Sequence, residues 1–281
     1  MAESTTSTLS HLITPLIQEV LYVSSERSIM RGLVRNFKVP ANSGKVLQVP
    51  IYPTVTATAP GEATDLSSTT VTTTSQDITL VENGIMVELT DLSRATSETD
   101  VVRDLGRLLG EAIARKMDTD LTALFDGFST EVGDGTAVTN AAAIFNAVSS
   151  LRENAVPNTD LACVVHPKIA YDIKAGLSAT FANPNPGVGN EALRSGFVGT
   201  IAGVPVYETS NMSNTGNAGE YKGAVFHKDA LGLAILNDLK IEIQRDASKR
   251  SQEIVATAVY GVKELQDTYG VELHGQSSIQ S

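Results

Sequence analysis

The chain has 281 residues, of which 42% are hydrophobic and 19% are charged, and its formal net charge at pH 7 is −11. This length accommodates one large domain or two ordinary ones with a substantial core. The negative charge argues against a protein whose main task is to grip nucleic-acid phosphates, because that task requires a basic surface.

The single cysteine, Cys163, excludes an intrachain disulfide and lies in the apolar run LACVVHP, which predicts a buried, inert thiol. The N-terminal sequence shows no basic segment followed by an apolar one, and no apolar run approaches the roughly 20 residues of a membrane span. We therefore expect neither a signal peptide nor a membrane-spanning segment.

The first 44 residues divide into two parts. Residues 1–10 are rich in Ser and Thr. The stretch that follows, HLITPLIQEVLYVSSERSIMRGLVRNF, has apolar residues at irregular helical spacing, and Pro15 suits a first helical turn. We expect a short helix and an arm that is too thin to build a core of its own.

Residues 45–92 have β character. Pro50 and Pro53 make KVLQVPIY an edge strand or an extended loop, and Pro60-Gly61 marks a turn. The stretch QDITLVENGIMVELTDL predicts two strands joined at Asn83-Gly84, because Asn-Gly is the strongest short hairpin signal. A hairpin so poor in large apolar residues cannot support itself. We expect its own domain or a neighbouring subunit to brace it.

The hydrophobic period then changes from two to about 3.6 residues. Ser97 with Asp100 resembles a capping box at the start of a helix that runs to Phe128. About 28 residues make a rod of roughly 40 Å. Gly106 and Gly110 each cost about 1 kcal/mol relative to Ala, so we expect them to permit close packing of another backbone. The apolar stripe of this predicted helix comprises Val101, Leu105, Leu108, Ala112, Met117, Leu121, Leu124 and Phe128, and it is widened by Val102, Leu109, Ile113 and Phe125.

From Asn140 onward the pattern is mixed α/β. Helices are predicted for AAAIFNAVSSLREN and for PKIAYDIKAGL, which has Pro167 at its first position. Strands are predicted for DLACVVHP and GTIAGVPVYETSNM, and later at 240–245, 253–262 and 269–273. Polar or Pro/Gly-rich loops, SATFANPNPGVGNEALRSG and SNTGNAGEYKG, separate several of these elements, and GDG at 133–135 is a turn.

Motifs of catalysis are sparse. The four histidines lie at 11, 166, 227 and 274, without metal-ligand spacing, and there is no CxxC, no Gly-x-Ser-x-Gly and no phosphate loop. His166 near Asp172 is either a base with its orienter or the end of a strand that caps the next helix. The cluster His227-Lys228-Asp229 is better explained as a turn, with Asp229 as N-cap or turn acceptor. We expect no catalytic residue, cofactor or metal.

The order of several motifs resembles a known family. CVVHPKIAYDI is followed by GTIAGVPVYETSNM, by GAVFHKDALGLAI and by ATAVYGVKELQDTYGVEL. This order over residues 163–273 resembles the major capsid proteins of tailed bacteriophages, which have the α+β HK97-like fold that encapsulin shells share. The resemblance implies an N-terminal arm, an extended E-loop hairpin, a peripheral P-domain with a long spine helix and an α/β axial A-domain.

On this resemblance the chain divides into six parts: the N-terminal arm 1–44, the E-loop 45–92, the P-domain with its spine helix 93–138, the A-domain 139–238, the P-domain return strands 239–265 and a C-terminal return to the A-domain 266–281. The hairpin and the arm would gain their buried surface on neighbouring subunits. In a ring such contacts are heterologous. The candidate contact residues are Pro15, Arg31, Arg35, Pro60, Gly61, Glu62, Asn185, Gly187, Asn214 and Asn217.

The resemblance implies a virion protein that is assembled in the host cytoplasm. It would form pentamers and hexamers of an icosahedral head around double-stranded DNA, without sequence-specific binding and without a membrane. A portal and cement proteins are further expected partners. No Lys lies between Val46 and Leu92, so covalent crosslinking through an E-loop Lys is not expected, and the short arm implies a separate scaffolding protein. The alternatives are an encapsulin-like compartment shell and a soluble α/β enzyme.

Overall fold

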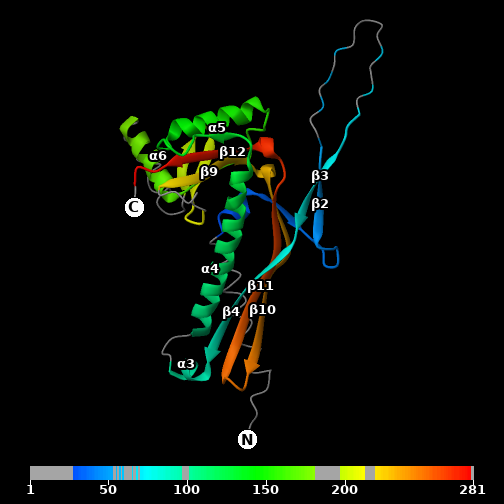
Figure 1. The fold of residues 1–281 in the computed structure, drawn as a ribbon, viewed down its shortest axis with the longest axis vertical. Helices are drawn as coiled ribbons and strands as arrows, with labels where there is room; N and C mark the ends of the chain where they lie inside the picture. The colour runs from blue at the N-terminus through cyan, green and yellow to red at the C-terminus, as the bar shows by residue number, and fades with distance from the viewer. Residues whose placement is uncertain are drawn as a thin grey trace.

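The computed structural model describes residues 28–52, 70–96, 101–180, 197–212 and 219–279, together with positions 55, 57, 59, 65 and 68. The chain builds an elongated body with two sheets, one long and narrow and one compact, and a hairpin that projects away from both (Figure 1). Among the described residues, no helix is both long enough and apolar enough to cross a membrane.

The long sheet has four strands, and one long helix lies along it (Figure 1). Its order is β1 (Arg35–Lys38), β10 (Leu231–Asp246), β11 (Ser251–Glu264) and β4 (Val81–Thr90). β1 is parallel to β10, and the other neighbours are antiparallel. The helix is α4 (Val101–Thr122), which continues into the 3-10 helix η1 (Ala123–Gly127) and follows the short helix α3 (Asp91–Thr96).

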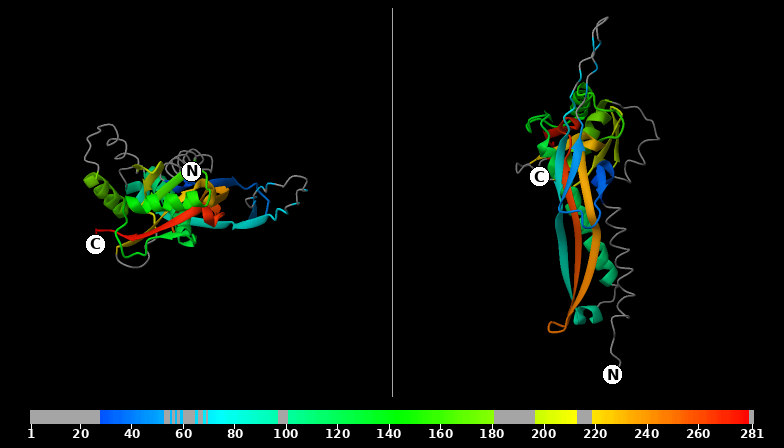
Figure 2. Two further views of the ribbon diagram at one scale, coloured as in Figure 1. Left: turned by 90° about the horizontal axis from the view of Figure 1, so that it is seen from above. Right: turned by 90° about the vertical axis from the view of Figure 1, so that its right-hand side faces the viewer.

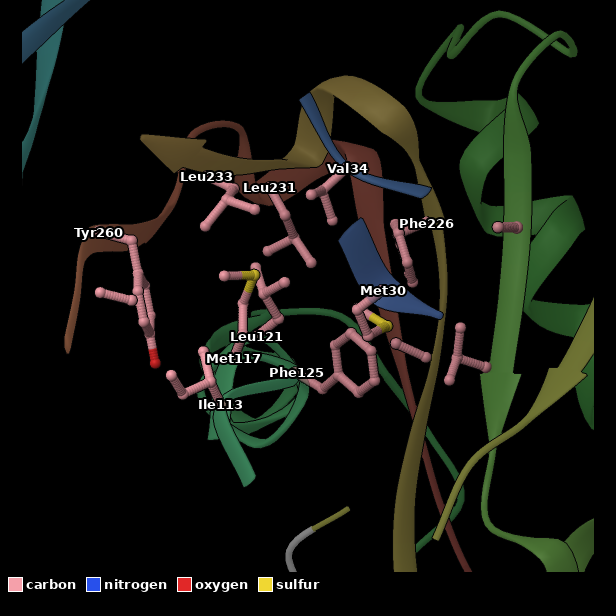
Figure 3. Close-up of a cluster of buried hydrophobic side chains, with 14 of the residues drawn as sticks. Met30, Val34, Ile113, Met117, Leu121, Phe125, Phe226, Leu231, Leu233 and Tyr260 are labelled. Carbon is pink, nitrogen blue, oxygen red and sulfur yellow. The ribbon is translucent and has the colours of Figure 1, made fainter. Parts of the chain in front are cut away.

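The core between α4 and the long sheet is built from one row of the helix. Leu109, Ile113, Met117 and Leu121 recur every four residues and are at most 6% exposed. They pack against the inner face of β11, and Phe125 continues the same row one turn beyond Leu121 (Figure 3). Leu108, which was expected in the apolar stripe, is instead 62% exposed. The expected cap, Ser97 with Asp100, lies outside the described residues.

Part of the N-terminal arm belongs to this core. The short helix α2 (Met30–Leu33) precedes β1, and both Met30 and Val34 are fully buried among α4 and β10 side chains (Figure 3). We expected the arm to gain its buried surface on a neighbour. Residues 28–38 instead find it in their own chain, because β1 pairs with β10 and carries these side chains inward.

The compact sheet has six strands in the order β5 (Glu131–Val132), β12 (Gly270–Gln276), β9 (Glu220–His227), β6 (Leu161–Val165), β8 (Val204–Glu208) and β7 (Phe197–Ile201). Helices α5 (Ala141–Glu153) and α6 (Pro167–Thr180) pack on it around a second core. The predicted single strand over 199–212 is wrong. Ala202 and Gly203 both have positive φ and turn the chain, so β7 and β8 pair as a hairpin.

The predicted hairpin at Asn83-Gly84 is also wrong. β4 runs through both residues without a turn and pairs with β11 along its whole length. Neither residue has a positive φ, which a two-residue Asn-Gly turn would require. Gly84 serves close packing instead, since an added Cβ would lie 3.0 Å from Thr257 Cγ2. The available partner strand therefore overrides the local turn signal.

The projecting hairpin is formed by β2 (Val46–Ile51) and β3 (Thr74–Thr79), which pair antiparallel (Figures 1 and 2). A small core that includes Val49, Ile78 and Leu265 holds its base against the long sheet. β3 and β4 are adjacent in sequence but belong to different sheets. The expected E-loop 45–92 therefore contains both the hairpin and a strand of the long sheet.

The chain passes from the compact sheet into the long sheet at one short turn. β9 ends at His227, the 3-10 helix η2 (Lys228–Ala230) follows, and β10 begins at once. β10 is continuous from Leu231 to Asp246, with irregular register between Ile235 and Lys240. The expected boundary between 238 and 239 thus lies inside a strand.

Candidate assembly surfaces

The turn at His227-Lys228-Asp229 is structural. His227 is 6% exposed, its Nδ1 accepts a hydrogen bond from the Asp229 backbone N at 3.2 Å, and its ring meets Tyr269 edge-on. Asp229 was expected to be the cap or turn acceptor, but the acceptor is His227. The Asp229 carboxylate instead accepts from Arg35 Nη1 at 3.3 Å. His227 Nδ1 also lies 3.8 Å from Asp229 Oδ2, so these two side chains meet within the turn itself.

His166 and Asp172 also have separate partners. The His166 ring stacks on Tyr221 with centroids 3.8 Å apart, and its Nδ1 accepts from the Lys168 backbone N. Burial, with the nearby charge of Lys168, lowers the pKa of His166. Asp172 accepts hydrogen bonds from the backbone N and the hydroxyl of Ser278. Of the two interpretations of His166, the structure agrees with the one in which the residue ends a strand and caps the next helix.

Asp118 anchors the described start of the arm. It is fully buried on α4 and accepts hydrogen bonds from Ser28 Oγ at 2.8 Å, Ile29 N at 3.1 Å and Met30 N at 3.3 Å. Burial raises the pKa of Asp118, and these hydrogen bonds oppose that rise. A carboxylate at this place satisfies the first backbone donors of α2, as an N-cap would.

Two of the predicted contact residues bind their own chain. Arg31 forms a bidentate pair with Asp238, with Nη1–Oδ1 at 2.9 Å and Nη2–Oδ2 at 2.6 Å. Arg35 lies 5.2 Å from the Phe37 ring centroid, in addition to its bond with Asp229. Both arginines stay partly exposed. Contact with a neighbouring subunit remains a prediction for both.

The projecting hairpin presents apolar side chains to solvent. Val46 is 45% exposed, Tyr52 69%, Val55 57% and Val71 48%. Two strands without a core cannot bury such residues by themselves. Several exposed apolar residues on one projecting hairpin are typical of a surface that another molecule covers. The predicted contact residues Pro60, Gly61 and Glu62 lie outside the described residues, as do Pro15, Asn185, Gly187, Asn214 and Asn217.

A charged cluster joins the compact sheet to the end of the long helix. Lys222 on β9 bonds the carboxylates of Asp126 on η1 and Glu272 on β12, the latter at 2.8 Å. Burial by itself would lower the pKa of Lys222, but the two carboxylates outweigh it and raise the pKa to about 12. Burial raises the pKa of Glu272, which is only 3% exposed, and Lys222 opposes that rise.

The same cluster contains His274, whose Nδ1 lies 2.7 Å from Glu131 Oε1. Glu131, Glu272 and His274 offer ligand atoms within 4.8 Å of one another. Because the Lys222 ammonium already bonds Glu272, its positive charge disfavours a metal cation at the same place. We therefore interpret the group as an ion-pair network that holds β5, β9 and β12 together.

Sequence reasoning missed the residues that tie these parts together. Asp118 interrupts an apolar helical face, which is the one local signal that could have marked it. Lys222, Glu272 and Asp126 are far apart in the sequence, so no spacing pattern links them. Cys163 is fully buried, as expected, and burial raises the pKa of its thiol.

Several solved capsid structures share this fold. The chain is similar to the capsid protein of the cyanophage P-SCSP1u, with 19% identity, 89% of each chain covered and a TM-score of 0.70. It is also similar to a chain in the structure of Mycobacterium phage Che8, with 21% identity and a TM-score of 0.68. The match covers 88% of this chain and 90% of the Che8 chain. For the head of Helicobacter pylori bacteriophage KHP40 the identity is 15%, the coverage 87% of each chain and the TM-score 0.66.

These similarities confirm the expected HK97-like fold. No curated protein matches the sequence. The phage capsid protein family model matches residues 52–271, which is most of the chain and spans every strand from β3 to β11 and the helices α4, α5 and α6. The chain therefore belongs to the phage capsid protein family.

Proposed function

We propose that this capsid protein forms pentamers and hexamers that close into an icosahedral phage head around double-stranded DNA. The family match supports a capsid role, and the HK97-like fold supports the role of major subunit in a shell. The observation that carries the proposal is the β2–β3 hairpin, which leaves the body and exposes Val46, Tyr52, Val55 and Val71. A neighbouring copy is the partner that covers it.

The two sheets correspond to the two expected domains. In this proposal the long sheet with α4 is the peripheral P-domain, and the six-stranded sheet with α5 and α6 is the axial A-domain. The expected ranges need several adjustments. β1 and β4, which lie in the expected arm and E-loop, belong to the long sheet, and β5, which lies in the expected P-domain, belongs to the compact sheet. In addition, β10 carries the chain into the long sheet at Leu231 rather than near 239. The ten predicted contact residues remain candidates for contacts between copies.

The remaining partners follow from charge and length. A net charge of −11 is consistent with a shell that encloses DNA and repels it rather than binding it. A separate scaffolding protein, a portal and cement proteins complete the proposed head, which is assembled in the host cytoplasm. The contacts of His166 and His227 within the chain support a structural role rather than catalysis.

Electron microscopy of the purified chain, with sedimentation to size the particles, tests the proposal. We expect rings or closed shells hundreds of ångströms wide, formed alone or with a scaffolding protein. Shells that co-purify with an enzyme cargo would favour the encapsulin-like alternative. A species that stays monomeric or dimeric across salt and concentration, with scaffold added, would refute the capsid assignment and favour the enzyme alternative.

A further inference from the structure

The compact sheet lies at one end of the long sheet, and three segments of the described chain join the two (Figure 1). The first, residues 127–130, leads from the end of η1 to β5. The second is η2, between β9 and β10. The third, residues 264–269, leads from the end of β11 through η3 (Asp267–Tyr269) to β12. We call these three segments the neck, because every described connection between the two sheets passes through them.

Hydrogen bonds join the three segments of the neck to one another. Leu265 N and Gln266 N both donate to Ala230 O, at 2.7 Å and 3.3 Å. Ser129 donates to the Asp267 carboxylate from its backbone N at 2.7 Å and also from its hydroxyl. The third segment therefore contacts both of the others, and a movement of one sheet against the other must disturb these contacts.

One carboxylate of the neck, that of Glu264, lacks a partner among the described residues. It lies against Gly127, since a Cβ added to that glycine would be 2.7 Å from Glu264 Oε2. The side chain is partly buried, and it forms no hydrogen bond or ion pair within the described part of the chain. Carboxylates that lose water on folding are normally paired or hydrogen-bonded. An ionised Glu264 is therefore enclosed at a cost that no pairing offsets.

The charges around Glu264 do not compensate for this enclosure. The charged groups on the elements that pack around it are Lys263 on β11, Asp267 on η3, Asp126 on η1, and Lys228 and Asp229 on η2. Asp126 is paired with Lys222. Asp229 is paired with Arg35. Burial raises the pKa of Glu264, the charge of Asp267 raises it further, and the charge of Lys263 opposes the rise.

We propose that the neck is a pH-sensitive joint, which opens less often when Glu264 takes up a proton and more often when Glu264 is ionised. Protonation removes a charge that burial disfavours, together with the repulsion between Glu264 and Asp267. The closed neck therefore binds the proton more tightly than an open neck, in which water reaches both carboxylates. By linkage, the closed neck is favoured as the pH falls through the raised pKa of Glu264 and is weakened as the pH rises above it. The joint belongs to one subunit and does not depend on the assembly proposed above.

Hydrogen exchange of the unassembled subunit tests the joint. The amides of Ser129, Leu265 and Gln266 each donate a hydrogen bond within the neck, so their exchange reports its opening. After correction for the intrinsic exchange rate, we expect their protection to be at least about threefold higher at pH 5 than at pH 7.5. The variant Glu264→Gln has the shape of the protonated acid without a charge, and it is expected to show the high protection at both pH values.

Two further variants separate Glu264 from other charged groups. Glu242→Gln removes an exposed glutamate of β10 outside the neck, and it is expected to keep the full pH response. Lys263→Gln removes the cation that favours ionised Glu264, so the midpoint of the response is expected to move to higher pH. An unchanged midpoint in Lys263→Gln would overturn the proposal. Because Lys263 is exposed, this test does not depend on the folding of Glu264→Gln.

Three other results would also overturn the proposal. One is wild-type protection that is the same at both pH values or higher at pH 7.5. Another is a rise in Glu264→Gln as large as that of the wild type, which would assign the response to another acid, such as Glu272 beside Lys222. The third is an equal rise at the buried amides of α5, such as those of Ala147 and Val148, because the response would then belong to the whole fold.

Discussion

Arg31 and Asp238 are 207 positions apart and form two parallel hydrogen bonds, with Nη2–Oδ2 at 2.6 Å. Their pairing joins the arm to the one irregular part of the β10–β11 ladder, between Ile235 and Lys240. An arginine–carboxylate fork defines orientation as well as distance. The arm is thus held at the start of α2 by two adjacent contacts, one from Met30 to Asp118 and one from Arg31 to Asp238.

The Arg31–Asp238 pair predicts a modest stability effect. Asp238→Asn is expected to lower the free energy of unfolding by about 1 kcal/mol, because the side chains are 29% and 41% exposed and solvent screens the pair. The exposed pair Lys240–Glu242 provides the control, and Glu242→Gln is expected to change stability by less than about 0.5 kcal/mol. Urea unfolding of unassembled protein measures both, and equal effects would contradict the role assigned to the fork.

Removal of Lys222 is expected to leave Glu272 as an unpaired buried carboxylate. Lys222→Met should cost about 3 kcal/mol at pH 7. Burial raises the pKa of Glu272 in the folded state, so its penalty grows as the pH rises through that pKa and shrinks as the pH falls. The variant should therefore recover part of its stability between pH 7 and pH 5, as thermal unfolding at several pH values would reveal.

The double variant Lys222→Met/Glu272→Gln is the control for this prediction, since it removes both charges. It is expected to be more stable than Lys222→Met at pH 7 and to lack the recovery at pH 5. If the single and double variants showed the same pH profile, Glu272 would not be the group responsible.

Gly261 lies where the hairpin base meets the long sheet. An added Cβ would collide with the Thr79 carbonyl oxygen and crowd Ile78. Gly261→Ala is expected to destabilise the fold by about 2 kcal/mol or more, because backbone must move. Gly176 is the matched site, since a Cβ there meets nothing within 4 Å in a helix, and Gly176→Ala should be neutral or stabilising by up to about 1 kcal/mol. Denaturant midpoints compare the two.

The exposed hairpin side chains predict an assembly defect without a folding defect. Val55→Asp is expected to leave the unfolding temperature of the free subunit within about 2 °C of wild type, since Val55 is 57% exposed. It should nevertheless reduce shell yield at least tenfold, because assembly would bury an unpaired charge. Val55→Thr keeps the shape without the charge and should assemble. Normal shells from Val55→Asp, counted by electron microscopy, would exclude this position from the subunit contacts.

Local sequence signals were sufficient to predict the elements whose hydrophobic period and end residues lie within the element itself. The long helix α4, the helix that follows Asn140, the strand that stops before Pro167 and the turn after His227 were all predicted and are present. In each of them the spacing of apolar residues, or a Pro or cap residue, acts within a few positions of the chain. The order of these elements also carried the resemblance to phage capsid proteins.

The tertiary structure decided what depends on distant partners. Asn83-Gly84 has the residues of a turn, but β11 pairs with β4 across it and the strand continues. Met30 and Val34 were placed on a thin arm, but β10 draws them into the core. Asp118 and Lys222 acquire their roles only from Ser28, Asp126 and Glu272, which meet them through folding. Burial and charge pairing depend on which residues the folded chain brings into contact. A local sequence pattern therefore does not indicate them when the partners are far apart in the sequence.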